Sequence, residues 1–192
     1  VCSILRQLAD LGVLTVCFTG GELFVRPEVF DIMECAKRLG LLVELITNAT
    51  RITTAVADRL QQLGVQDLYI SIYGATQQTY ERVTGIPGSY ALFRKGLACV
   101  ASQNLPVAAV RMPVMTLNAH EVEEAKALVE GQGFKFQYCL DIYPRTDGDV
   151  SPLAVRLWPT EKVRLNERLV GYHSHAAAPE ESCHLHSRFI EC

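Results

Sequence analysis

Apolar and polar positions along the chain recur in a repeating unit, an amphipathic helical segment that ends in Leu-Gly and is followed by a short apolar run. The unit occurs three times, and its helical segments close at Gly12, Gly40 and Gly64. Glycine suits the left-handed residue that closes a helix. The apolar runs, such as residues 14–18, are typical of strands buried on both faces. The pattern predicts an α/β fold with a parallel sheet.

Two more strands and three more helices follow in a less regular pattern, which brings the predicted number of strands to five. Asn118 is expected to cap the helix that follows it, because its side chain can accept a hydrogen bond from a free helical amide. Pro159 with Thr160 is a typical helix start. The later helices are predicted over residues 90–102, 121–131 and 159–169, and the strands over 107–112 and 134–140.

The two ends of the sequence depart from the repeat. A helix over residues 3–11 opens the chain, although such a helix would normally cover a strand that precedes it, so we expect a first strand and its loop upstream. From residue 171 the sequence loses its periodicity. We therefore predict one domain over residues 1–170, followed by a linker that begins the segment 171–192.

The composition narrows the class of protein. A chain of 192 residues with 49% hydrophobic and 20% charged residues has the balance of a folded domain. Its formal net charge of −3 leaves no cationic excess for phosphate or an anionic bilayer. No apolar run reaches the roughly 20 residues that a membrane span needs. We expect a cytoplasmic protein with neither nucleic acid nor membrane as a partner.

Seven cysteines are spread along the sequence without a C-x-x-C pair, so it contains no complete zinc or cluster motif. Their odd number, without secretory features, predicts reduced thiols. Cys17 and Cys35 share the spacing of apolar neighbours and are expected in the core. Cys183 differs from them because it lies in a polar segment that contains histidines.

The residues that follow the predicted strands are polar and should meet at one edge, because parallel strands end on the same side of a sheet. Gly20-Gly21-Glu22 follows the first strand, Asn48 follows the second, and Ser71 lies near the end of the third. Two glycines let the backbone approach a ligand, and the carboxylate can accept hydrogen bonds from an ammonium group. A glycine turn with a helix-capping Glu22 fits the same spacing, and Asn48 and Ser71 can be plain turn and strand-end residues.

Other polar and glycine-rich stretches are also candidate binding sites. Arg82 precedes a loop with glycine and proline over residues 85–90, and it is either a binding residue or a surface arginine. The acidic loop over residues 141–149 lacks the ligand order of an EF-hand, so a solvated turn is expected there. Gly20-Gly21 lacks the G-x-G-x-x-G spacing of a dinucleotide site.

Six short stretches, taken in order, resemble the radical S-adenosylmethionine (SAM) superfamily, and in particular its branch of peptide-modifying and cofactor-maturing enzymes with a C-terminal SPASM-type cluster domain. The resemblance implies a partial (β/α)6 barrel of the TIM type, whose first strand leads into a C-x-x-x-C-x-x-C loop that holds a [4Fe–4S] cluster. That strand and loop would precede this chain. The matching stretches are residues 8–12, 19–23 with 26–27, 46–50, 71–74, 80–85 with 88–90, and 144–149.

The resemblance also implies a cofactor and the residues that contact it. In the family, SAM binds the unique iron of the cluster, and reduction cleaves it to a 5′-deoxyadenosyl radical that abstracts a hydrogen from the substrate. A carboxylate suits an ammonium, and an arginine fork suits a carboxylate. In this sequence the resemblance assigns the methionyl amino group to Gly20, Gly21 and Glu22, the ribose or carboxylate to Asn48 and Ser71, and the carboxylate also to Arg82.

Partners and a second cluster follow from the same resemblance. It implies a peptide or small-molecule substrate and an electron donor such as flavodoxin or ferredoxin. Cys183, with residues 187–190, is similar to the opening of a SPASM domain, and would ligate an auxiliary iron–sulfur cluster. Ala49 stands where many relatives have Gly, and Tyr73 where many have Asp.

We therefore expect the barrel core of a radical SAM oxidoreductase. The three cluster cysteines are absent from the sequence and Cys2 alone cannot replace them, so the chain by itself is not expected to cleave SAM. One alternative is a degenerate, non-catalytic barrel that binds a peptide or protein partner. Another is an iron-independent barrel enzyme that uses Glu22 and Asp141 as acid and base.

Overall fold

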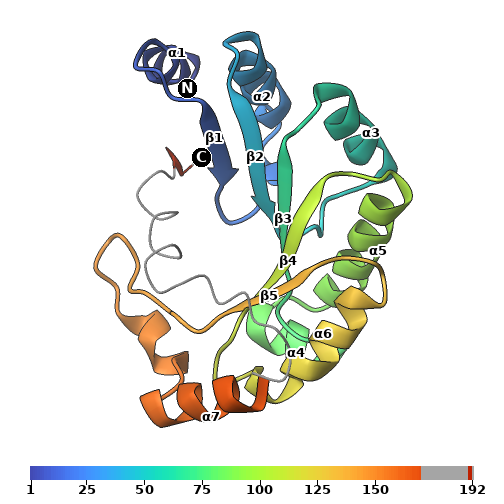
Figure 1. Ribbon diagram of the computed structural model, residues 1–192, viewed down its shortest axis with the longest axis vertical. Helices are drawn as coiled ribbons and strands as arrows, with labels where there is room; N and C mark the ends of the chain where they lie inside the picture. Colours follow the sequence, from blue (N-terminus) through green and yellow to red (C-terminus); the bar gives the residue numbers. More distant parts are fainter. Residues whose placement is uncertain (170–189, 192) are drawn as a thin grey trace. The chain divides into compact units, whose positions relative to one another are not determined.

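A computed structural model describes residues 1–169 and 190–191 of the chain, in which strands and helices alternate (Figure 1). The strands form one parallel sheet in the order β5-β4-β3-β2-β1-β6. They are β1 (Thr15–Thr19), β2 (Leu42–Thr47), β3 (Asp67–Ser71), β4 (Val107–Pro113), β5 (Phe136–Cys139) and β6 (Ile190–Glu191).

The described residues also form seven α-helices and three short 3-10 helices, of which α1 precedes the first strand. The α-helices are α1 (Cys2–Asp10), α2 (Val29–Arg38), α3 (Thr54–Leu63), α4 (Gln77–Thr84), α5 (Ser89–Ser102), α6 (Val122–Glu130) and α7 (Pro159–Leu169). The 3-10 helices are η1 (Leu23–Val25), η2 (Ala119–Glu121) and η3 (Ser151–Val155).

The predicted α/β fold with a parallel sheet is confirmed. The ends of β1 to β5 differ by no more than two residues from the ends that the apolar runs predict, which are 14–18, 42–46, 68–72, 107–112 and 134–140. Gly12, Gly40 and Gly64 have φ values of 80°, 79° and 61°, so the Leu-Gly repeat does close helices in the left-handed conformation. The 3-10 helices were not predicted, because three to five residues are too few to show an amphipathic period. Apart from β6, the predicted linker over 171–192 lies outside the described residues.

The chain divides into two compact units. Unit 1 contains Val1–Ser71, Ala91–Ala109 and β6, and unit 2 contains Ile72–Tyr90 and the described residues from Val110 onward. In unit 1 the amide of Leu68 donates to the carbonyl of Pro106, and in unit 2 the amide of Ile72 donates to the carbonyl of Arg111.

The sheet of unit 1 has one sealed face and one open face. Helix α2 packs on β2 and on its neighbours α1 and α3, and Figure 1 shows all three helices on the same side of β1, β2 and β3. Side chains on that side are buried, whereas those that alternate with them stay partly exposed. The sealed face carries Val16, Phe18, Val43, Leu45, Thr47, Leu68 and Ile70, and the open face carries Cys17, Glu44, Ile46, Asp67, Tyr69 and Ser71.

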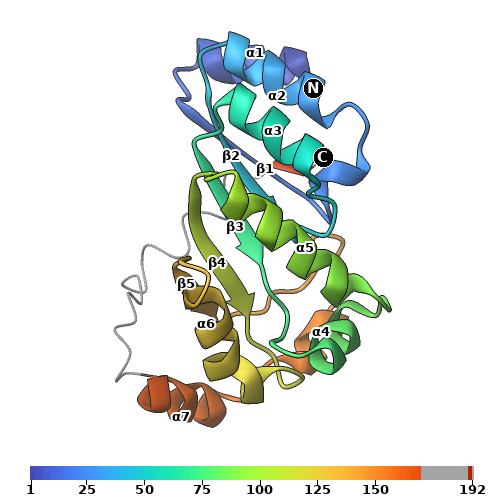
Figure 2. The same ribbon diagram turned by 90° about the vertical axis from the view of Figure 1, so that its right-hand side faces the viewer.

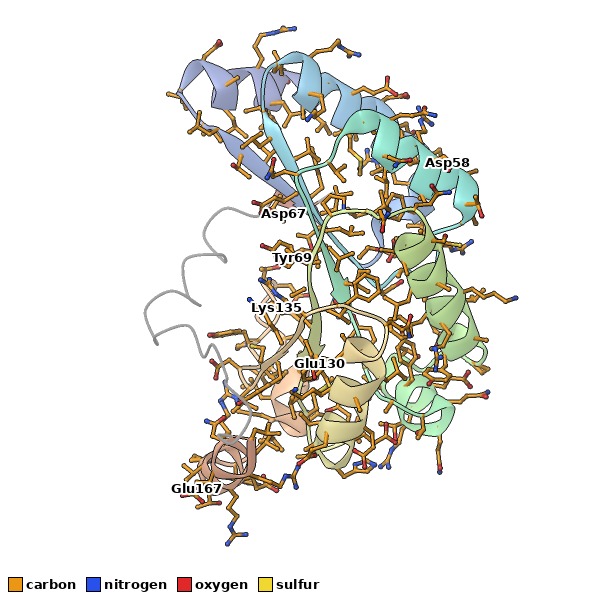
Figure 3. The ribbon with its side chains drawn as sticks, turned by 45° about the vertical axis from the view of Figure 1, so that its right-hand side comes forward. Asp58, Asp67, Tyr69, Glu130, Lys135 and Glu167 are labelled. Carbon is orange, nitrogen blue, oxygen red and sulfur yellow. The ribbon has the colours of Figure 1, made fainter. Side chains whose placement is uncertain are left out.

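Figure 3 shows the two faces at β3. Asp67 and Tyr69 project from the strand on the side away from α3, which carries Asp58. The two residues are two positions apart, so their side chains share a face by the period of a strand. Parallel sheets are usually covered on both faces, and here the described helices of unit 1 cover one.

Unit 2 is built around β4, β5 and α6, which lie side by side (Figure 2). Its core holds Val110, Met112 and Val114 from the β4 segment, with Val122 and Val129 from α6. A second cluster of aromatic rings joins Tyr80 to Tyr73 and Tyr90, each with ring centroids 5.6 Å apart. Within the described residues, no helix has the length and apolar character needed to cross a membrane.

A close contact fixes α5 against the turn that follows β2 in unit 1. Gly96 is buried on α5, and a Cβ built there would overlap the carbonyl oxygen of Ala49. Ala49 is fully buried and has a φ of 59°, a left-handed conformation that glycine adopts more easily. This conformation gives a physical reason for the glycine that the resemblance leads one to expect at position 49.

We predict that Gly96→Ala lowers the free energy of unfolding by about 3 kcal/mol or more, because the added methyl group must displace backbone and not a flexible side chain. Urea unfolding followed by circular dichroism measures the loss. Lys95→Ala, at an exposed position of the same helix, is the matched control and should change stability by less than about 0.5 kcal/mol. Equal stability of the two variants would contradict the contact.

Candidate functional site

The candidate site lies at the carboxyl edge of the unit 1 sheet. β1, β2 and β3 run parallel, so the segments that follow Thr19, Thr47 and Ser71 leave the sheet at the same edge. The register pairs Thr47 at the end of β2 with Ile70 of β3, so the next residues along, Asn48 and Ser71, occupy matching positions. Both are partly exposed and belong to the open face.

The carboxylate of Glu22 ties the segment after β1 to the end of β2. Its Oε1 accepts from the amide of Phe24 at 3.2 Å, which caps η1, and its Oε2 accepts from the amide of Asn48 at 2.9 Å. The hydroxyl of Thr47 lies 2.8 Å from Oε1 and 2.9 Å from Oε2. The interpretation of Glu22 as a capping residue is confirmed, and a contact with an ammonium group stays a prediction.

The two glycines before Glu22 are exposed. A Cβ built on Gly21 would meet no atom within 4 Å, and Gly21 is not among the residues with positive φ. Neither packing nor backbone conformation in unit 1 therefore requires glycine at position 21. The open space beside it leaves room for a ligand to approach the backbone closely.

Asn48 forms a local turn, as one of its two interpretations predicts. Its Oδ1 accepts from the amide of Thr50 at 3.0 Å and from the hydroxyl of Thr50 at 2.6 Å. This pattern is an Asx turn, in which the side chain takes the place of a backbone carbonyl. The backbone amide of Asn48 donates to Glu22 at the same time. The backbone and the side chain of Asn48 therefore both help to fix the carboxyl edge of the sheet.

Unit 1 thus brings together five of the six predicted cofactor contacts, namely Gly20, Gly21, Glu22, Asn48 and Ser71, at one edge of its sheet. The sixth, Arg82, belongs to unit 2, where it is exposed in the last turn of α4. Helix α4 ends at Thr84 and is capped by Gly85, whose φ is 68°. A basic residue in a last turn also interacts favourably with the helix dipole, which agrees with the surface interpretation.

Glu121 holds the start of α4 in unit 2. This buried carboxylate accepts from the amides of Ala75 at 2.7 Å and Thr76 at 3.1 Å, and from the hydroxyls of Thr76 and Thr79, both at 2.6 Å. Burial acts to raise the pKa of Glu121, but the hydrogen bonds outweigh burial and hold the pKa below its ordinary value of 4.5. The ionised carboxylate therefore fixes the loop that follows β3.

Asn118 stands at the N-cap position of η2, as predicted, but the predicted hydrogen bond from its side chain to a helical amide is wrong. Its Nδ2 donates to the carbonyls of Tyr73 at 3.1 Å and Pro113 at 3.0 Å, and its Oδ1 accepts from the amide of Met115 at 2.7 Å. The fully buried side chain joins the loops that follow β3 and β4 within unit 2. These three hydrogen bonds satisfy the buried side-chain amide of Asn118, which would be costly to leave unpaired.

Sequence reasoning assigned no role to Thr47, Glu121 or the bridging contacts of Asn118. The partners of Glu121 lie more than 40 residues away along the chain, so no local motif marks the contact. A signal was nonetheless present at Thr47, a hydroxyl directly after the apolar run of β2 and directly before Asn48. A polar residue on the sealed face of a strand needs a hydrogen-bond partner.

The described residues contain no group of three or more His, Cys, Asp or Glu side chains placed to hold a metal ion. Cys35 is buried, as predicted, and its pKa is raised by a hydrogen bond with the Cys2 thiol and by burial. Cys17 is half-buried on the open face, which corrects its assignment to the core: in the register of β1 its side chain points away from the helices. Cys183 lies outside the described residues.

The acidic loop of unit 2 is exposed and held by its own turns, in agreement with the predicted solvated turn. Asp149 accepts from the amide of Ser151 at 2.8 Å and from its hydroxyl at 2.7 Å. Asp141 accepts from the ammonium of Lys162 at 2.8 Å, with about half of its side chain exposed. An exposed ion pair of this kind contributes little to stability.

Comparison with known proteins gives a consistent result. Residues 3–129 match the family model described as the Radical SAM superfamily. The chain is 29% identical over 145 residues to the AdoMet-dependent heme synthase of Methanosarcina barkeri (strain Fusaro / DSM 804), covering 76% of this chain and 41% of that protein. It is 29% identical over 147 residues to the PqqA peptide cyclase of Gluconobacter oxydans (strain 621H), covering 69% of this chain and 41% of that protein.

The fold is similar to that of a solved structure described as native anSMEcpe with bound AdoMet and the Cp18Cys peptide. The TM-score is 0.72 at 15% identity, and the match covers 99% of this chain and 54% of that one. The likeness shows the fold, an α/β arrangement shared with the partial barrel of these proteins. The chain spans about two fifths of the length of the two curated relatives and about half of that structure.

We predict that the stability contributed by Glu121 depends on pH. Because its folded pKa lies below the unfolded value, the contribution is present above about pH 4.5 and is lost as the pH falls through the folded pKa. Glu121→Gln should therefore be less stable than the original protein by about 1–3 kcal/mol at pH 7, with a gap that narrows below pH 4.5.

Urea unfolding between pH 7 and pH 3 measures this gap. Glu124→Gln, which removes an exposed carboxylate from the same segment, is the control and should follow the original protein at every pH. A Glu121→Gln gap that stays constant over the whole range would show that the charge of Glu121 contributes nothing.

Proposed function

The chain belongs to the radical SAM superfamily, and on that premise we propose that it is the barrel core of an iron–sulfur oxidoreductase that binds SAM and modifies a peptide or a small precursor. One observation carries the proposal. The carboxylate of Glu22 is held in place by η1 and by the end of β2, beside an open Gly20-Gly21 backbone at the carboxyl edge of the sheet.

The residues of this edge suit the polar end of SAM. Glu22 offers a half-buried carboxylate to the methionyl ammonium, and charge-assisted hydrogen bonds of this kind are about twice as strong as neutral ones. The open space at Gly21 lets a ligand reach the backbone carbonyls. We assign Asn48 and Ser71, on the open face, to the ribose or the carboxylate.

Arg82 is assigned to the carboxylate of SAM on the strength of the resemblance. Its guanidinium is exposed on α4 and carries a fork of donors that matches a carboxylate. The helix that carries it begins at the loop held by Glu121 and Asn118, so its start is fixed within unit 2.

The described residues do not supply ligands for a [4Fe–4S] cluster, because no three cysteines lie together among them. In the family such a cluster supplies the electron that cleaves SAM and so yields a 5′-deoxyadenosyl radical. The part played by this chain is to bind and orient the methionyl end of SAM. We also propose that Cys183 ligates an auxiliary cluster of a SPASM-like segment that begins in residues 171–192.

The relatives support a peptide as the substrate class. One is named PqqA peptide cyclase, and one structural neighbour is described with a bound peptide. We propose that flavodoxin or ferredoxin donates the electron and that the enzyme works in the cytoplasm.

The test uses the full-length protein, reconstituted anaerobically with iron and sulfide and reduced with dithionite. We expect SAM binding by equilibrium dialysis and formation of 5′-deoxyadenosine by chromatography. Combined Glu22→Ala, Ser71→Ala and Arg82→Ala substitutions should abolish SAM binding, and unchanged binding would overturn the site. SAM binding without 5′-deoxyadenosine would favour a non-catalytic barrel that binds a partner, and activity that survives removal of iron would favour acid–base chemistry at Glu22 and Asp141.

We further predict that Gly21→Ala separates binding from stability. A methyl group at residue 21 meets no protein atom, so the free energy of unfolding should change by less than about 0.5 kcal/mol. The same methyl group would occupy the space proposed for SAM and should weaken SAM binding by about tenfold or more. Equilibrium dialysis and urea unfolding of the same preparation measure both quantities. Unchanged SAM affinity would show that the ligand does not approach Gly21.

A further inference from the structure

Thr47 is an unusual residue for its position. It ends β2 on the sealed face, in line with the apolar residues Val43 and Leu45, and only 3% of its surface is exposed. Among the described residues of unit 1, it is the buried residue with a polar side chain. Valine has nearly the same shape and would fill the same space, so packing alone does not account for a hydroxyl here.

The hydroxyl of Thr47 is fully used in hydrogen bonds. It accepts from the amide of Ala49 at 3.0 Å, and it faces both oxygens of Glu22, at 2.8 Å and 2.9 Å. A hydroxyl has a single proton, so it can donate to one of these oxygens at a time. Because the two distances are nearly equal, the Thr47 proton can donate to either oxygen of Glu22 with similar geometry.

The other donors to Glu22 are backbone amides, which are fixed to one oxygen each. Phe24 donates to Oε1 and Asn48 donates to Oε2. The two carboxylate oxygens offer about four acceptor positions together. Two amides and one hydroxyl proton fill three of them, and the fourth remains for an incoming donor.

We propose that Thr47 is a positioning residue for the Glu22 carboxylate. When a ligand ammonium donates to one oxygen of Glu22, the Thr47 proton donates to the other, so the carboxylate keeps its orientation and its full set of hydrogen bonds. No covalent bond changes in this step, and the proton stays on the Thr47 oxygen throughout. The inference rests on the proposed function, because it takes the ammonium to be the methionyl amino group of SAM.

The test compares two ligands of the reconstituted full-length protein. SAM carries the amino and carboxylate groups, whereas 5′-methylthioadenosine has the same adenosine and lacks both. Thr47→Val removes the hydroxyl with little change in shape, and we expect it to weaken SAM binding by about tenfold while changing 5′-methylthioadenosine binding less than about twofold. Thr47→Ser keeps the hydroxyl and should bind both ligands within about threefold of the original protein.

Two controls separate positioning from a general loss of structure. Thr15→Val makes the same exchange at the opposite end of the unit 1 strands, on the open face, and should leave both affinities unchanged. A double-mutant cycle with Glu22→Gln provides the second control. If Thr47 acts through Glu22, then Thr47→Val should cause little further loss of SAM affinity in the Glu22→Gln background.

Each contrary outcome has its own meaning. Equal losses for both ligands, no loss for SAM, or additive losses in the double-mutant cycle would each overturn the role of Thr47. Failure of Thr47→Ser to retain SAM binding would do the same, since the hydroxyl is still present. Absence of SAM binding by the original protein would overturn the proposed function itself.

Discussion

The sealed face of the unit 1 sheet is the constraint on which the rest of the candidate site depends. Because α1, α2 and α3 cover one face, alternate residues of β1, β2 and β3 must be apolar, and the residues between them are free to be polar. Asn48 and Ser71 lie on the open face for this reason. Thr47 breaks the rule, and the cost of burying its hydroxyl is met by Glu22.

The position of the site therefore depends on the alternation of side chains along the strands as much as on the residue types that follow them. Shifting the register of β2 by one residue would exchange Thr47 and Asn48 between the two faces and would separate Glu22 from both of its β2 partners. The Glu22 carboxylate contacts Thr47, 25 residues further along the chain. This side-chain contact depends on the pairing of β1 with β2. The packing of Gly96 on α5 against Ala49 fixes the turn that follows β2.

Local patterns in the sequence were sufficient for strands β1 to β5 and for the helices that close at the Leu-Gly repeat, but they did not predict the 3-10 helices or the contacts between elements. The Leu-Gly repeat and the apolar runs predict β1 to β5 because helix ends and buried strands depend on near neighbours. Glu22 could be placed at the edge from its position after β1, but its hydrogen bond with Thr47 joins residues 25 positions apart, and no local pattern marks it. Asn118 was assigned to the wrong partner, because Tyr73 is 45 residues away and no periodicity relates the two.

The hydrogen bonds of Glu22 also bear on how a ligand would arrive and leave. The carboxylate is oriented by three donors before any ligand is present, so association would require little reorganisation of this edge. Preorganisation of that kind places the entropic cost in folding, where it is incurred once, and not in each binding event. A ligand that donates to Glu22 would therefore meet a carboxylate whose contacts with η1 and with the end of β2 are already formed.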